Sequence, residues 1–196
     1  MKTQNLIRWG GLVTIVAAIL LVIGGMSSLN GRTVVGQWFT IAGFVVLVFA
    51  MMALYGAQVE RSGVLGVVGF VLTVLGATLI PIFQFAVLAR VSGVDPDSAV
   101  VQFFNATPLG LIGPISFILG LIVFSIATFR ARVLPRWAGV LLGVGAVVFL
   151  SGGAESGLFL ILGSVGLVAI ALGLAWMGWA LWSGKGEVAG QAKPAM

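Results

Sequence analysis

The chain has 196 residues, of which 60% are hydrophobic and only 8% are charged, and its formal net charge is +5. Soluble domains are closer to half apolar and a quarter charged, so this chain could not cover a water-facing surface with polar groups. It contains no Cys and no His, which excludes disulfides, thiolate metal sites and histidine-ligated haem. We therefore expect an all-α membrane protein with neither metal nor cofactor.

Six apolar segments are long enough to cross a bilayer, which takes about 20 residues of helix. The first follows Lys2 and Arg8 as a signal peptide would, but no small-x-small cleavage site comes after it, so we interpret it as a retained helix. We predict a six-helix bundle forming a single transmembrane domain over residues 1–182, followed by a polar, disordered tail over residues 183–196. The segments are residues 7–26, 38–57, 64–89, 109–129, 137–153 and 158–182.

Basic residues are distributed unevenly between the two sides of this bundle. If the N-terminus is inside, only Arg32 and Arg90 of the ten basic residues face outward. Cytoplasmic loops are enriched in Lys and Arg, so we predict a multi-pass protein of the cell's inner (plasma) membrane with both termini cytoplasmic. The residues predicted on the inner side are Lys2, Arg8, Arg61, Arg130, Arg132, Arg136, Lys185 and Lys193.

Glycines recur at regular intervals along the chain. A Gly near the start of the first, third and fifth segments is followed thirteen residues later by another. This spacing predicts three repeated helical hairpins, although glycine is abundant and chance matches are common. The pairs are Gly11 and Gly24, Gly63 and Gly76, and Gly139 and Gly152.

Small residues three or four positions apart share one helix face and let two helix backbones approach closely. Gly139 and Gly143 form such a GxxxG pattern, which we assign to packing inside the bundle in preference to a dimer contact. The residues assigned to helix packing are Gly113, Gly120, Gly139, Gly143, Gly166 and Gly173.

The loop between the third and fourth segments gathers polar residues on the predicted outer side. Asp95 can cap a short helix that begins at Pro96 and lies on the membrane surface. A pocket here could hold a polar group at Gln84 and Arg90 and an apolar body between Phe rings, whereas the alternative is a solvated loop. The candidate ligand or partner site comprises Gln84, Arg90, Asp95, Asp97, Gln102, Phe103, Phe104 and Glu155.

Three stretches at the ends of predicted helices carry a resemblance. They are LYGAQVERSG at residues 54–63, LGVVGF at 65–70 and RARVLPRWAG at 130–139. They resemble a family of small, uncharacterised bacterial polytopic membrane proteins of unknown function. The resemblance covers the second to fifth segments and implies a bacterial multi-helix membrane protein, but it implies no activity and no functional residue.

Catalytic and ion-coupling signatures are missing from the sequence. No charged residue lies near the middle of a segment, which argues against proton pumps, ion-coupled transporters and voltage sensors. There is no GxSxG, HExxH or phosphate-binding loop, so we expect no catalytic residue and no enzyme activity. The basic residues form no patch, so nucleic acid is not an expected partner.

These observations favour a non-enzymatic integral membrane protein that serves as an accessory or structural subunit of a membrane complex. Its expected partners are the lipid bilayer and either other membrane subunits or further copies of the chain. The alternative is a carrier or substrate-binding subunit for a small, largely apolar molecule. A polar cavity open to the outer face would favour the carrier, and a continuous groove rich in glycine, with no cavity, would favour the subunit.

Overall fold

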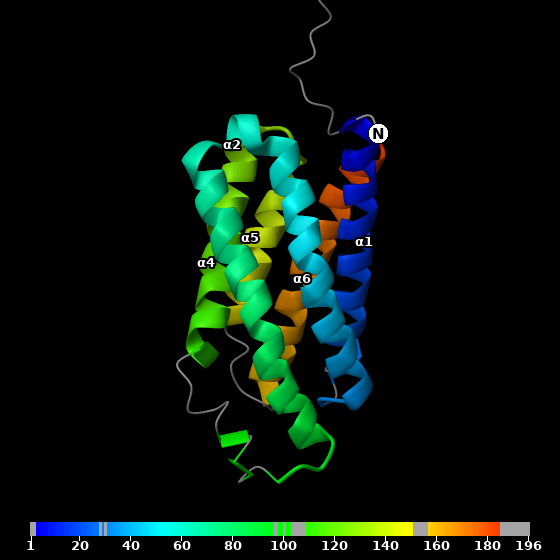
Figure 1. The fold of residues 1–196 in the computed structure, drawn as a ribbon, viewed down its shortest axis with the longest axis vertical. Coiled ribbons are helices and arrows are strands. Elements are labelled where there is room, and N and C mark those ends of the chain that lie inside the picture. Colours follow the sequence, from blue (N-terminus) through cyan, green and yellow to red (C-terminus); the bar gives the residue numbers. More distant parts are fainter. Residues whose placement is uncertain are drawn as a thin grey trace, which may run out of the picture.

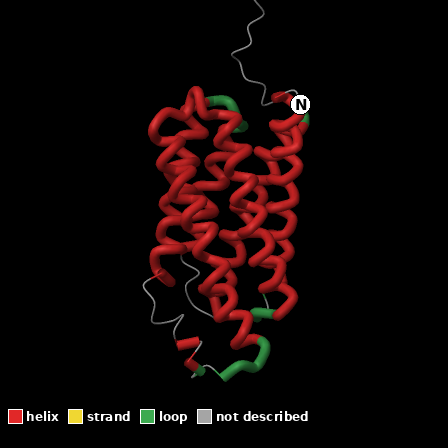
Figure 2. Tube along the Cα trace, viewed as in Figure 1, coloured by secondary structure: helices red, strands yellow, loops and turns green. Residues whose placement is uncertain are grey.

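The computed structural model describes residues 3–27, 29, 31–95, 98–99, 101–102, 109–150 and 157–184. Within these ranges the chain forms five helices and no strand, which confirms the all-α prediction (Figure 2). The helices are α1 (Thr3–Ser27), α2 (Val34–Val91), α4 (Leu109–Ala131), α5 (Arg136–Leu150) and α6 (Gly157–Trp182).

The prediction of a six-helix bundle is wrong, because the second and third predicted segments belong to one helical element, α2. This element has 58 residues, and a straight helix of that length would extend about 87 Å, nearly three times the thickness of a bilayer core. Gly63, with φ 55° and ψ −156°, reverses the chain within α2, so its two arms run antiparallel (Figure 1). Only a residue without Cβ adopts this conformation at little cost.

Aromatic contacts join the two arms of α2 along their length. The rings of Tyr55 and Phe70 are stacked with centroids 4.8 Å apart, close to the reversal at Gly63. Near the opposite ends of the arms, Trp38 and Phe85 meet edge to face at 6.0 Å. The six residues before Gly63, from Ala57 to Ser62, include no Gly or Pro. The sequence therefore could not distinguish two helices joined by a linker from one helical element with a sharp turn.

The helices pack around a filled apolar centre. α2 contacts α1 and α4, α6 contacts α1 and α5, and α4 contacts α5, which closes the bundle into a ring. Phe44, Phe117 and Phe124 are fully buried inside it, and Phe44 meets Phe117 edge to face at 5.2 Å. The buried hydroxyls of Thr40 and Thr73 donate to backbone carbonyls four residues earlier, so they need no ligand.

The outer surface of the bundle is strongly apolar. Large hydrophobic side chains from every helix are exposed, and contiguous apolar surface of this extent marks contact with a membrane or a partner. Four helical elements, α1, α2, α4 and α6, are long and apolar enough to cross a membrane, and α5 is shorter, with 15 residues. The structure therefore agrees with a multi-pass membrane protein.

One end of the bundle collects most of the described basic residues. The start of α1, the reversal in α2, the end of α4, the start of α5 and the end of α6 all lie at this end (Figure 1). We call it the basic end, and the orientation of the basic end toward the cytoplasm stays a prediction. Its described basic residues are Arg8, Arg61, Arg130, Arg132 and Arg136, whereas Arg32 and Arg90 belong to the opposite end.

Candidate functional site

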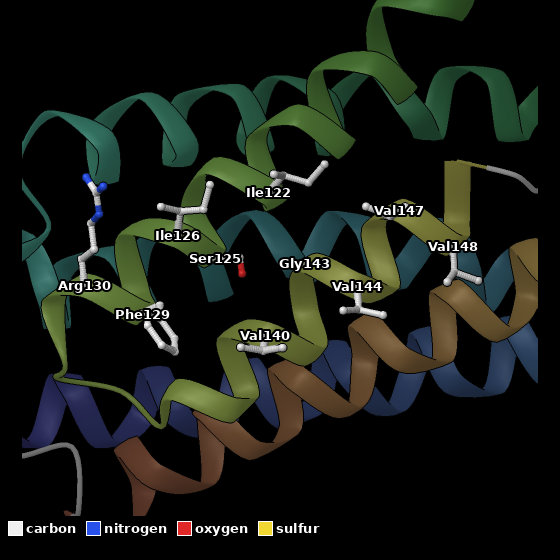
Figure 3. Close-up of a pocket in the computed structure, with 10 residues that line it drawn as sticks. All are labelled: Ile122, Ser125, Ile126, Phe129, Arg130, Val140, Gly143, Val144, Val147 and Val148. Carbon is white, nitrogen blue, oxygen red and sulfur yellow. The ribbon is translucent and has the colours of Figure 1, made fainter.

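A groove with a volume of about 570 Å³ opens on the side of the bundle between α4 and α5. Branched aliphatic side chains of α4 and α5 form its walls, and Ser125 and Gly143 lie between them (Figure 3). Phe129 and Arg130 lie toward the basic end. The full lining is Ile122, Ser125, Ile126, Phe129, Arg130, Val140, Gly143, Val144, Val147 and Val148.

The groove follows from how α4 and α5 touch. The hydroxyl of Ser125 donates to the carbonyl oxygen of Gly139 at 2.6 Å, which holds the two helices together near their short connection. One helical turn further along α5, Gly143 has no side chain to cross the gap, and an added Cβ there would meet only the side chain of Ser125. Gly143 and Ser125 are therefore in close contact, and together they form the floor of the groove.

The chemistry of the groove is apolar. The Ser125 hydroxyl already donates its hydrogen bond to the Gly139 carbonyl, so it is not paired with a base as a nucleophile would be. Arg130 is the one titratable residue in the lining, and it stands at one end. Across the described residues no group of His, Cys, Asp or Glu could hold a metal ion. The walls suit an apolar helix face or an acyl chain.

The outer-side site predicted from the sequence lies at the other end of the bundle. Gln84 and Arg90 are half-buried in the last turns of α2, and Asp95 and Gln102 are exposed. The backbone N–H of Gln102 donates to the backbone carbonyl of Ser98 at 3.0 Å, which gives a helical turn where the interfacial helix was predicted. None of these residues lines the groove. The other site residues, Asp97, Phe103, Phe104 and Glu155, lie outside the described ranges, so the site stays a prediction.

All six glycines assigned to helix packing face a neighbouring helix. A Cβ at Gly113 would lie 3.1 Å from the Cβ of Leu79, and one at Gly120 would collide with Thr73, both on α2. Gly139 and Gly143 face α4, as described above. Gly166 faces Phe149 and Gly173 faces Ala138, both on α5.

Sequence reasoning missed a buried polar contact between α2 and α4. Gln58 is only 1% exposed, and its Nε2 donates to the hydroxyl of the fully buried Thr128 at 3.1 Å. The signal was available, because Gln58 continues the buried stripe of Met51 and Leu54 at helical spacing.

Comparison with protein-family models, with curated proteins and with solved structures finds no match to this chain. The resemblance noted for residues 54–63, 65–70 and 130–139 therefore stays a prediction.

Proposed function

We propose that the protein is a non-enzymatic subunit of a membrane complex and that the groove between α4 and α5 binds one apolar transmembrane helix of a partner protein. The observation that carries the proposal is the groove itself, which is apolar, open to the side and floored by Gly143 and Ser125. Membrane helices associate where small residues let another backbone approach, because lipid supplies no hydrophobic force between them.

The filled centre of the bundle supports a binding role over a transport role. A carrier needs a path through the bundle, and the fully buried rings of Phe44, Phe117 and Phe124 occupy that space. The groove opens sideways instead, and Ile126, Val144 and Val147 in its walls are about half exposed. In a bilayer these side chains would face lipid until a partner helix covered them.

The carrier alternative makes a different claim about the same groove. A volume of about 570 Å³ lies in the range of about 300–1,000 Å³ typical of small-molecule sites, so an apolar molecule would also fit. Such a molecule would be enclosed on most sides in a good site. This groove has walls on α4 and α5 only, which suits the convex side of a helix better.

The absence of Cys from the chain allows a direct test by single-cysteine cross-linking. Val144→Cys places a thiol in the groove wall, and Val165→Cys places one on an exposed position of α6 that does not line the groove. With a thiol-attached photo-cross-linker in native membranes, we expect Val144→Cys to give a discrete adduct with another protein and Val165→Cys to give none.

Three other results of this experiment would contradict the proposal. Equal adducts from the two positions would mean random encounter in the membrane. An adduct of Val144→Cys with a second copy of the chain would make the groove a homo-oligomer contact. Capture of a small apolar molecule alone would favour the carrier.

We also propose that the basic end faces the cytoplasm, as the distribution of Arg and Lys indicates. Reporter fusions after residue 60, after residue 133 and at the C-terminus should then report a cytoplasmic location. Fusions near Gly31 and Asp97 should report an external one. An external C-terminus would overturn this orientation.

A further inference from the structure

A second cavity, of about 540 Å³, lies at the basic end beneath the connection between α4 and α5. It differs from the groove in chemistry, because two guanidinium groups and two indole rings line it together. Its lining is Arg132, Val133, Leu134, Pro135, Arg136, Trp176, Trp179 and Ala180. No residue of the groove is among them.

The backbone holds Arg132 in an unusual conformation. α4 ends at Ala131, and Arg132 follows with φ 58° while its N–H donates to the carbonyl of Thr128 at 3.2 Å. This position after a helix is commonly Gly, since a side chain is strained in the left-handed region. Among the described residues Arg132 is the one residue other than Gly with positive φ. An arginine at a position that favours glycine points to a use for its side chain.

The cavity is rich in positive charge. α5 begins at Arg136, four residues after Arg132, and the two exposed arginines flank the cavity. Neither has an acidic partner in the part of the chain that the structure describes. The Arg136 guanidinium lies 5.9 Å from the centre of the Phe129 ring, which helps to position it. Two planar guanidinium groups on one cavity suit the paired oxygens of a phosphate.

Two indole rings beside the arginines suit the level of the lipid headgroups. Trp176 and Trp179 on α6 are 47% and 58% exposed, and Trp is enriched where a membrane helix meets the headgroup region. One turn before Trp176, the exposed Leu172 continues into the apolar surface of the bundle. A ligand here would have a phosphate at the arginines and acyl chains along α6.

We propose that this cavity binds the phosphate headgroup of an anionic phospholipid through Arg132 and Arg136, with Trp176 and Trp179 against its glycerol. Basic pockets between membrane helices are known sites for such headgroups. A soluble phosphate ester would share the phosphate contacts but not those of the acyl chains. This inference does not depend on the partner helix proposed for the groove, because the two cavities share no residue.

Native mass spectrometry in mild detergent tests the proposal by counting bound lipids. With added phosphatidylglycerol, the wild-type protein should retain one molecule more than with phosphatidylcholine. Arg132→Gly and Arg136→Gln should each weaken this binding about fivefold, since each arginine near a headgroup contributes about 1 kcal/mol. Arg136→Lys keeps the charge and should retain most of the binding. Arg61→Gln is the matched control, because it removes one arginine at the same end outside the cavity.

Arg132→Gly also separates binding from folding. Glycine relieves the left-handed strain at this position, so the variant should melt no lower than wild type without lipid, while phosphatidylglycerol should raise its melting temperature less than that of wild type. Equal retention of the two lipids, or an equal loss in Arg61→Gln, would reduce the effect to general surface charge and overturn the site. If glycerol phosphate raises the melting temperature as much as the lipid does, the ligand is soluble and the lipid assignment is wrong.

Discussion

α4 contacts α2 on one side and α5 on the other, and the two contacts differ in how closely the backbones approach. Against α2, an added Cβ at Gly69 would lie 2.5 Å from the backbone nitrogen of Phe124, and one at Gly120 would collide with the backbone of Thr73. Against α5, a Cβ at Gly139 would stand 3.4 Å from the carbonyl oxygen of Ser125, an ordinary contact distance. The α2–α4 contact therefore requires glycine, whereas the α4–α5 contact would tolerate a small side chain at Gly139.

This difference shows that a membrane helix can be fixed on one side and open on the other. Close backbone approach gives many dispersion contacts and brings weak backbone contacts into range, so it stabilises the α2–α4 pair where lipid provides no hydrophobic force. The α4–α5 pair keeps a groove and is joined by the hydrogen bond from Ser125 to Gly139 and by the edge-to-face contact of Phe117 with Phe149 at 6.2 Å. We therefore expect stability to depend on the first contact and partner binding on the second.

The largest expected effect is from Gly120→Leu in the α2–α4 contact. The new side chain would need the space of the Thr73 backbone, and overpacking of this kind should cost about 3 kcal/mol or more. Gly56→Leu is the control, because nothing lies within 4 Å of a Cβ at that exposed helical position. Thermal unfolding in detergent should show a large loss for the first variant and little change for the second. Equal melting temperatures would mean that α2 and α4 are not in close contact.

The reversal that brings the second arm of α2 to α4 gives the next effect. Gly63→Ala meets no atom within 4 Å, so any loss comes from backbone strain alone, which we expect to be about 1–3 kcal/mol. Gly56→Ala, in a regular helical conformation, should instead stabilise the protein by about 0.5–1 kcal/mol. Opposite shifts of the melting temperature would support the reversal at Gly63, and a stabilising Gly63→Ala would contradict it.

The all-helical class and the approximate positions of the helical segments could be predicted, because membrane helices appear in a sequence as long apolar segments. The predicted boundaries of the first and last segments differ from those of α1 and α6 by a few residues. The number of helices was wrong because Gly63 reverses the chain through backbone angles alone. The turn between residues 57 and 64 was predicted, but nothing in this stretch showed that residues 57–62 would stay helical up to Gly63.

The cavities were harder to predict than the helices. The groove depends on which faces of α4 and α5 meet, and a GxxxG pattern at Gly139 and Gly143 does not tell a closed contact from an open one. The cavity at Arg132 and Arg136 combines α6 with the α4–α5 connection, and these segments are about 40 residues apart in the sequence. The prediction of a site around Gln84 used proximity along the chain. Proximity in sequence does not show whether the residues enclose a pocket.

Gly143→Ala tests the open contact directly and should have a smaller effect than Gly120→Leu. Its Cβ would stand 2.7 Å from the Ser125 hydroxyl oxygen, and a side chain can move where a backbone cannot. We expect a loss of about 1 kcal/mol, at the low end of the overpacking range. The added methyl group also takes up space at the floor of the groove. We therefore expect a marked fall in the yield of the Val144→Cys adduct and only a small fall in the melting temperature. A large loss of stability with unchanged cross-linking would show that Gly143 belongs to the closed core.

The smallest expected effect comes from Ser125→Ala. This change removes the hydroxyl that donates to the Gly139 carbonyl at 2.6 Å, and hydrogen bonds between membrane helices average about 0.6 kcal/mol. The Gly139 carbonyl also belongs to the backbone of α5, so the variant leaves only one of its two lone pairs without a partner. Ser116→Ala on the same helix is the control, since Ser116 is equally buried and makes no hydrogen bond to α5. The free energy of unfolding can be measured by urea or thermal unfolding in detergent. A slightly larger loss for Ser125→Ala than for Ser116→Ala would assign the difference to the α4–α5 contact. If Ser125→Ala instead destabilises the protein as strongly as Gly120→Leu, then α4 is held equally on both sides and the distinction between its two contacts fails.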